Sequence, residues 1–110
     1  MQYARLGETG LVVSRLAFGS MTFGHATAGP FTTVYKVDQA GANDLVARAI
    51  DGGVNFFNSA DVYAGGDSER ILGKALGARR REVVIATKVG NRTGPALIES
   101  GLSRRHVLAA

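Results

Sequence analysis

An apolar run leads into a polar loop that carries a tyrosine in the stretch Val54-Asn55-Phe56-Phe57-Asn58-Ser59-Ala60-Asp61-Val62-Tyr63. Twenty-five residues after Tyr63, the apolar run Val83-Val84-Ile85-Ala86-Thr87 is closed by Lys88. Both runs have the length and composition of short β-strands. In parallel α/β barrels, residues at the carboxyl ends of strands and in the loops that follow carry the chemistry. Tyr63 and Lys88 are therefore a candidate proton-donating pair.

Two interpretations of this pair are open from the residues alone. A tyrosine hydroxyl, with a pKa near ~10, is a weak acid at neutral pH, and a nearby ammonium group strengthens it because it favours the ionised form. In the other interpretation, Lys88 extends to solvent from a strand end and Tyr63 only packs within its loop. Spacing by itself does not choose between them.

Two helices are predicted around these strands. Asp38 can cap the first helix, whose apolar positions recur at helical spacing until Gly52-Gly53 ends it. The second helix is expected from Ser68 to Leu76, with Asp67 as its cap and Gly77 after its last turn. The residues expected to face the core are Ala42, Leu45, Val46, Ala49 and Ile50 in the first helix and Ile71, Leu72, Ala75 and Leu76 in the second.

The N-terminal third is expected to hold a hairpin, a strand and a loop. Residues 2–13 have the pattern of a small hairpin, and residues 15–18 that of a short strand broken by Gly19-Ser20. Residues 24–36, with Gly29-Pro30 in the middle, form a loop of a length that tends to be functional or mobile.

The order of elements is hairpin, strand, helix, strand, helix, strand and, after a possible cap at Ser103, the start of a third helix. Alternating strands and helices imply right-handed crossovers and a parallel sheet, so the fold class is α/β. The strand over 83–87 is apolar throughout, which is typical of a strand covered on both faces. The length of 110 residues is compatible with one domain, 1–110.

Composition restricts the possible partners. Thirteen basic and nine acidic residues give a net charge of +4, with arginines clustered at 79–81 and 104–105. Such clusters can bind nucleic acid or an anionic cofactor, but no aromatic residues interleave with them. Solvated loop and helix ends are therefore the favoured interpretation, and no nucleic-acid partner is expected. The chain has no cysteine, no leader-like N-terminus and no run of ~20 apolar residues, so we expect a cytoplasmic protein without membrane association.

Other motifs carry less information. Gly65-Gly66 before a helix could bind a phosphate, yet the G-x-G-x-x-G fingerprint of a Rossmann domain is absent. Gly19 could let a ligand approach the backbone closely, or it could merely make a turn. His25 and His106 share no metal-ligand spacing, so both are expected at the surface and no metal site is predicted. Asp61 has the position of a turn residue.

Several stretches, taken in order, are similar to the start of an aldo-keto reductase. They are Tyr3 to Ser14 (YARLGETGLVVS), Gly19 to Gly24 (GSMTFG), Phe56 to Tyr63 (FFNSADVY), Ser68 to Leu76 (SERILGKAL), Ile85 to Gly90 (IATKVG) and Gly101 to Val107 (GLSRRHV). This resemblance spans nearly the whole chain and is far more specific than any single motif.

The resemblance implies the N-terminal part of a (β/α)8 TIM barrel, about three βα units plus the hairpin, that binds NADPH without a Rossmann domain. It also implies an oxidoreductase that reversibly reduces aldehyde or ketone carbonyls to alcohols. By position, Tyr63 would be the general acid, Lys88 the cation that strengthens it, and Asn58 a third member of the site. The residues that would line the cofactor side of the pocket are Gly19, Ser20, Met21 and Asn58.

The resemblance has two departures. The family's aspartate, five residues before the tyrosine, is Asn58 here, which can accept a hydrogen bond from Lys88 but cannot neutralise its charge. An ion pair at about 4 Å, with an effective dielectric near 20, is worth roughly 4 kcal/mol before solvation costs. A whole barrel needs about 250 residues, and the family's histidine after the fourth strand would lie beyond Ala110, on a different element from His106. 

We therefore expect a truncated reductase that is inactive as 110 residues alone. The alternative is a catalytically inactive cofactor- or partner-binding remnant of the same fold, comparable to the relatives that serve as channel subunits.

Overall fold

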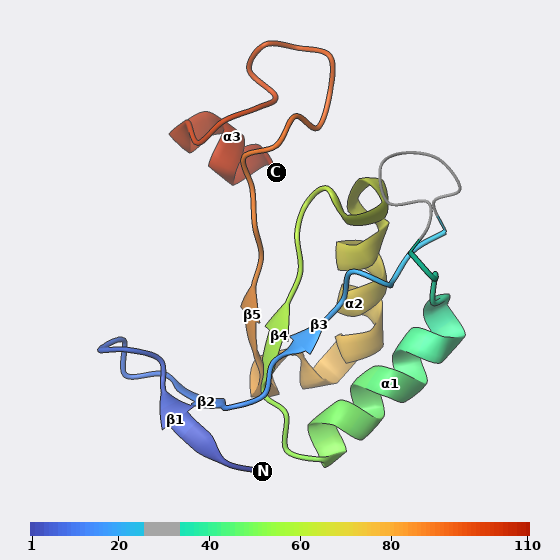
Figure 1. Cartoon of the computed structure of the whole chain (residues 1–110), viewed down its shortest axis with the longest axis vertical. Helices are drawn as coiled ribbons and strands as arrows, with labels where there is room; N and C mark the ends of the chain where they lie inside the picture. The colour runs from blue at the N-terminus through green and yellow to red at the C-terminus, as the bar shows by residue number, and fades with distance from the viewer. Residues whose placement is uncertain (26–33) are drawn as a thin grey trace.

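The computed structural model describes residues 1–25 and 34–110. Its centre is a parallel sheet in the order β3 (Phe18–Gly19), β4 (Phe56–Asn58) and β5 (Val84–Ala86). Helices α1 (Gln39–Asp51) and α2 (Asp67–Leu76) lie side by side and cover one side of the strands (Figure 1). The predicted α/β class with a parallel sheet is thus confirmed.

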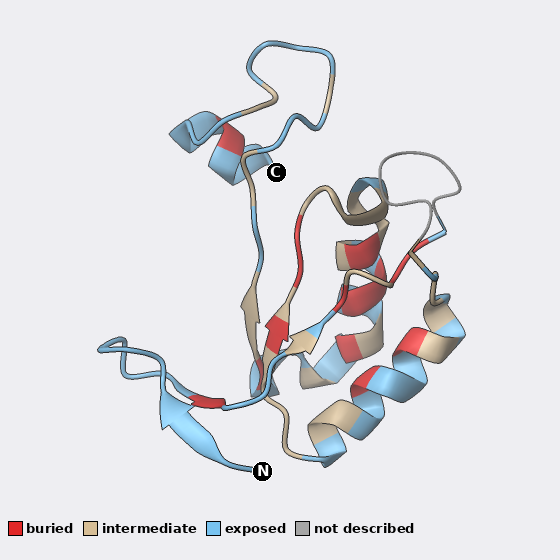
Figure 2. Ribbon diagram, viewed as in Figure 1, coloured by how far each residue is buried: buried red, intermediate tan, exposed pale blue. Residues whose placement is uncertain are grey.

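The hydrophobic core lies between the strands and the two helices, whose buried faces turn toward the sheet (Figure 2). Phe57 of β4 is fully buried at its centre, and the ring of Phe18 lies 5.3 Å from it and 5.8 Å from the ring of Phe23, measured between centroids. Full burial of a phenylalanine side chain contributes about 1.5–3 kcal/mol to the stability of the folded state. The other buried members are Ala42, Val46, Ile71, Leu72, Leu76 and Val83.

Helix α1 begins and ends as predicted. The carboxylate of Asp38 accepts a hydrogen bond from the amide of Gly41 at 2.9 Å, and Gly52 follows the last turn. Leu45 does not face the core as expected, because it is 42% exposed.

The start of α2 differs from the prediction. The residue before the helix is Gly66, at φ 90°, and Asp67 is the first helical residue, so the assignment of Asp67 as the cap is wrong. Its carboxylate instead forms an ion pair with Arg70 at 3.2 Å, one turn on. An acidic side chain in the first turn also interacts favourably with the helix dipole. The expected end at Gly77, which has φ 47°, is confirmed.

The N-terminal hairpin consists of β1 (Tyr3–Arg5) and β2 (Val12–Ser14), paired antiparallel as predicted. It lies below the starts of the parallel strands in Figure 1. The side chain of Asn55 fastens it there: its Oδ1 accepts from the amide of Ser14 at 2.7 Å, and its Nδ2 donates to the carbonyl of Val12 at 3.1 Å. The hydroxyl of Tyr3 donates to the carbonyl of Gly53 at 2.8 Å.

Two strand predictions need correction. The expected strand over 15–18 is wrong in its limits, because β3 contains Gly19, which was expected to break it. The strand over 83–87 was expected to be covered on both faces, yet all three residues of β5 are only half-buried. In the described part of the chain, β5 pairs with β4 on one side only.

The arginines at 79–81 lie in the 3-10 turn η2 (Gly77–Glu82), as expected of a helix end. Arg79 forms ion pairs with Asp51 at 2.7 Å and Glu82 at 3.2 Å. The hydrogen bond that Arg79 donates to Asp51, the largest of several influences, raises the pKa of Arg79. This guanidinium therefore links the end of α1 to η2.

Beyond β5, the chain runs away from the sheet to α3 (Arg104–Ala109), which is separate from the two-helix layer (Figure 1). The predicted cap is confirmed, since Ser103 Oγ accepts from the amide of His106 at 3.2 Å. His106 was expected at the surface, which is wrong, because it is 3% exposed and packs inside this C-terminal segment. The predicted loop over 24–36 has its middle, including Gly29-Pro30, outside the described residues.

Candidate active site

Tyr63 begins the 3-10 turn η1 (Tyr63–Gly66), which links β4 to α2. The next three residues, Ala64, Gly65 and Gly66, all have positive φ, at 50°, 65° and 90°. For alanine this left-handed conformation costs roughly 1–2 kcal/mol. Packing against Gly24 leaves no room for a side chain there, because an added Cβ would lie 2.4 Å from Ala64 Cβ. The turn that holds Tyr63 is therefore tightly defined.

Lys88 follows β5 and reaches back over the end of β4. Its Nζ donates to Asn58 Oδ1 at 2.6 Å and to the carbonyl of Ser59. The same Nζ lies 4.9 Å from the centre of the Tyr63 ring. The structure thus brings together Tyr63, Lys88 and Asn58, the three side chains assigned to catalysis from the sequence, at the carboxyl ends of neighbouring strands.

The lysine is held by neutral oxygens. No carboxylate of residues 1–25 or 34–110 forms an ion pair with Lys88. The amide of Asp61 donates to the carbonyl of Lys88 at 3.1 Å, so this turn residue ties the two strand ends together. Its carboxylate oxygen Oδ2 is buried and has no hydrogen-bond partner in the described structure.

The residues expected on the cofactor side of the pocket differ in how far their side chains and backbone are exposed. Gly19 is exposed, and a Cβ built on it would meet no heavy atom within 4 Å, so the space beside its backbone is open. Met21 is half-buried. Ser20 is fully buried, and its hydroxyl bonds to protein groups, so only its main chain could meet a ligand.

A cluster of buried hydroxyls was missed by sequence reasoning. Ser20, Ser59 and Ser68 are each at most 1% exposed, and their Oγ atoms lie within 3.4 Å of one another. They come from the ends of β3 and β4 and from the first turn of α2. A polar residue in a predicted helix is normally expected at the surface. The burial of Ser68 could therefore be recognised only from the tertiary structure.

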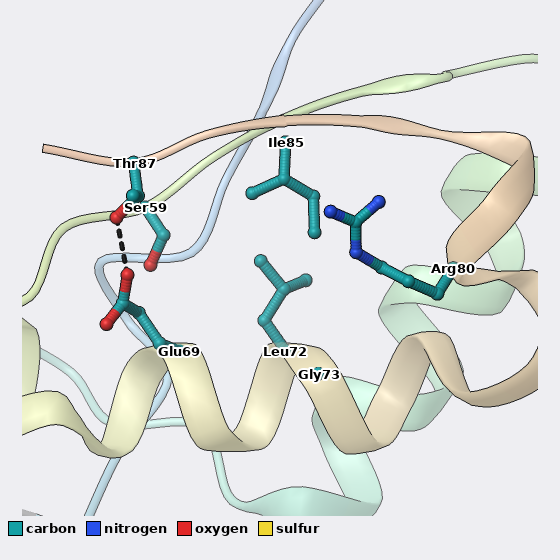
Figure 3. A pocket seen from close by; sticks show the side chains of 7 residues that line it. All are labelled: Ser59, Glu69, Leu72, Gly73, Arg80, Ile85 and Thr87. Atoms are coloured by element: carbon teal, nitrogen blue, oxygen red, sulfur yellow. Dashed lines mark hydrogen bonds between the residues drawn. The ribbon is translucent and has the colours of Figure 1, made fainter. Parts of the chain in front are cut away.

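A pocket of ≈ 250 Å³ lies between β5 and α2, and Tyr63 does not line it (Figure 3). Leu72 and Ile85 face each other across it, and the guanidinium of Arg80 points toward both. At the other end, Thr87 Oγ1 donates to a carboxylate oxygen of Glu69. Ser59 and Thr87, which follow β4 and β5, line the end of the pocket nearest the strand ends.

The histidines and acidic residues offer no alternative centre. His25 is exposed as predicted, and its Nδ1 lies 3.8 Å from Asp67. Across residues 1–25 and 34–110, no three histidine, cysteine or acidic residues are grouped so as to hold a metal ion. Nor does that part of the chain contain a helix long and apolar enough to cross a membrane.

Parallel strands followed by helices, with a tyrosine and a lysine meeting at the strand ends, are the arrangement found in barrel-type α/β proteins, whose sites lie in the βα loops. The family model described as Aldo/keto reductase family matches residues 15–110. The chain belongs to this family, and its sheet matches the N-terminal part of aldo-keto reductase (β/α)8 barrels.

Similar proteins include channel-associated and reductase members. Two plant proteins named probable voltage-gated potassium channel subunit beta, from Arabidopsis thaliana and Oryza sativa subsp. japonica, are each 42% identical over 98% of this chain and 31% of their own length. The holo form of an aldo-keto reductase from Bacillus halodurans matches with a TM-score of 0.68 and 36% identity, covering 84% of this chain and 27% of that one. The structure of a Pseudomonas aeruginosa protein assigned to the same family matches with a TM-score of 0.68 and 38% identity, covering 80% of this chain and 33% of that one. The chain thus spans about a third of the length of these relatives.

Proposed function

We propose that residues 1–110 are the N-terminal fragment of a single aldo-keto reductase barrel domain, an oxidoreductase that uses NADPH to reduce aldehyde or ketone carbonyls to alcohols. The observation that carries this proposal is the contact between Lys88, Asn58 and Tyr63. The three residues come from separate positions in the sequence, yet Nζ lies 2.6 Å from Asn58 Oδ1 and 4.9 Å from the tyrosine ring centre.

In this mechanism Tyr63 donates a proton to the carbonyl oxygen of the substrate. Negative charge then develops on the phenolic oxygen, and the ammonium of Lys88 beside the ring stabilises it. Asn58 Oδ1 and the carbonyl of Ser59 fix the direction of that ammonium. When bound, NADPH would supply the hydride that the carbonyl carbon receives.

The residues at the end of β3 suit such a cofactor. The open space beside Gly19 leaves its backbone accessible to a flat group. Met21 offers a half-buried apolar surface, and Asn58 a side-chain amide at the neighbouring strand end. Ser20 would contribute its main chain only, since its hydroxyl is buried.

One observation favours a second function, a cofactor- or partner-binding protein without turnover. Asn58 leaves Lys88 without a carboxylate partner in the described residues, which weakens the case for efficient proton donation. Relatives with 42% identity are named as potassium channel beta subunits, so a protein partner is compatible with the sequence of this chain.

The first prediction separates the two functions. We define the completed barrel as residues 1–110 fused to the remaining segment of the Bacillus halodurans aldo-keto reductase. In it, Tyr63→Phe keeps the ring but removes the proton, and general acid catalysis typically contributes about 10²–10⁴-fold. Steady-state reduction of a generic aldehyde should fall within that range, while NADPH affinity, followed by fluorescence quenching, should hardly change.

Tyr35→Phe is the matched control, because Tyr35 is 80% exposed and lies outside the site. Wild-type turnover in Tyr63→Phe, with turnover abolished in Lys88→Met, would show that the proton comes from elsewhere. A completed barrel that binds NADPH but reduces no aldehyde would favour the binding function.

A further inference from the structure

Three buried hydroxyls meet where β3, β4 and α2 converge. Ser20 Oγ lies 2.9 Å from Ser59 Oγ and 2.9 Å from Ser68 Oγ, and Ser59 Oγ lies 3.4 Å from Ser68 Oγ. Ser68 Oγ also donates to the carbonyl of Ser20 at 2.6 Å. The three residues are 0–1% exposed.

One direction of donation satisfies all three hydroxyls, each of which has a single hydrogen to give. Ser20 Oγ donates to Ser59 Oγ, Ser59 Oγ to Ser68 Oγ, and Ser68 Oγ to the carbonyl of Ser20. The donors thus form a closed circuit that returns to its first residue. Removing one of the three hydroxyls leaves a buried polar group without a hydrogen-bond partner, which lowers the stability of the folded state.

The circuit is joined to the lysine through the Asn58–Ser59 backbone. The carbonyl of Asn58 accepts from the Ser20 amide at 3.0 Å and lies 3.2 Å from Ser20 Oγ, and the amide of Ser59 donates to the carbonyl of Ala86 at 2.9 Å. The carbonyl of Ser59 remains directed at Lys88 Nζ. The hydroxyl circuit therefore includes the side chain of Ser59, whose carbonyl is one of the two oxygens that hold the lysine.

This support matters because the oxygens that hold Lys88 are neutral. Attraction between a charge and a dipole falls off faster with distance than attraction between two charges, and it depends on the dipole's direction. A carboxylate would retain the ammonium through small displacements, whereas a carbonyl must be kept in place. In the described residues no carboxylate pairs with Lys88.

We propose that Ser59 and Ser68 are positioning residues that act through the Ser59 carbonyl to hold Lys88 beside Tyr63. This inference rests on the proposed reductase function. Neither hydroxyl touches substrate or cofactor, so their effect is on the placement of the ammonium. A misplacement of about 1 Å in such a site can cost about 10²-fold in rate.

The test uses Ser59→Ala and Ser68→Ala in the completed barrel, with Ser14→Ala as the matched control. Ser14 is also a buried serine, 3% exposed, whose hydroxyl accepts from the amide of Asn55 at 3.2 Å, but it lies at the opposite ends of the strands. We expect kcat to fall about 10- to 100-fold in the two site variants and to stay near wild type in Ser14→Ala. NADPH affinity should stay the same in all three.

A second-site change distinguishes positioning from loss of stability. In an Asn58→Asp background the lysine gains a carboxylate, so Ser59→Ala and Ser68→Ala should then lower kcat by less than threefold. Should either alanine variant fail to fold, the other decides. Equal kcat losses in the site variants and Ser14→Ala, or no relief from Asn58→Asp, would overturn this proposal. An inactive wild-type completed barrel would instead refute the proposed function.

Discussion

At the scale of single residues, Asn58 differs from an aspartate by one amide group in place of one oxygen. The hydrogen bond to Lys88 is retained at 2.6 Å, so the geometry of the contact survives. What is lost is a full negative charge beside an ammonium. The roughly 4 kcal/mol of Coulomb energy at about 4 Å is partly offset by desolvation, so the net effect of restoring the charge is smaller.

We therefore predict that Asn58→Asp raises aldehyde reductase turnover in the completed barrel by about 10-fold, equivalent to about 1.4 kcal/mol of barrier. The new carboxylate would occupy the position of Oδ1 and fix the ammonium beside Tyr63. Asn43→Asp, on the exposed face of α1, adds the same charge away from the site and serves as the control. Equal turnover in both variants and in the wild type would show that the positive charge of Lys88 is already balanced by another group.

The residues at the strand ends could be predicted from the sequence, and the supporting residues could not. Tyr63 and Lys88 each follow an apolar run, and parallel strands place all such positions at one edge of the sheet. Ser68 depends on where α2 lies against β3, which no local pattern encodes. His106 was misjudged for the same reason, because its burial comes from a segment that folds around a six-residue helix.

At the scale of elements, the turn η1 sets the position of Tyr63 relative to α2. Its left-handed residues fit only because Gly24 presents no side chain to Ala64. Gly24 is in turn fixed by its amide, which donates to the carbonyl of Val37 at 3.1 Å. Val37, just before α1, therefore supports through Gly24 the turn that carries Tyr63.

We predict that Gly24→Ala destabilises the completed barrel by about 1–3 kcal/mol, the usual cost of overpacking, since the new Cβ would lie 2.4 Å from Ala64 Cβ. The free energy of unfolding from urea titration measures this effect. Adding Ala64→Gly removes the opposing methyl group and should recover most of the loss. If the double variant is no more stable than Gly24→Ala, the contact with Ala64 is not the cause.

The elements themselves were predictable where local chemistry decides them. The cap at Asp38, the apolar face of α1 and the glycine ends of both helices depend on neighbouring residues alone. Element limits were less predictable, because β3 extends through Gly19 only when paired with Asn58 of β4. The half-burial of β5 likewise depends on which strands lie beside it.

At the scale of the whole molecule, the described chain exposes large apolar side chains and a strand edge. β5 is half-buried, and large side chains of the C-terminal segment are open to solvent, among them Leu97 at 88%, Leu102 at 75% and Leu108 at 69% exposed. An unpaired strand edge beside such surface favours association between chains.

We therefore predict that the isolated 110-residue chain aggregates or unfolds without a cooperative transition. Size-exclusion chromatography and a urea titration followed by circular dichroism would measure this, with the completed barrel as the reference. A monomeric chain with a sharp two-state transition would show that the two-helix core is sufficient by itself.

The attachment of the hairpin to Asn55 has a consequence for synthesis on the ribosome. The hydrogen bonds from Ser14 and Tyr3 reach partners 41 and 50 residues further along the chain. At about 5–20 residues per second, the hairpin waits roughly 2–8 s for Asn55 to be made. A lone two-stranded hairpin is marginally stable in water. The hairpin thus becomes ordered only after these later residues have been made, and during that interval it is available to chaperones and proteases.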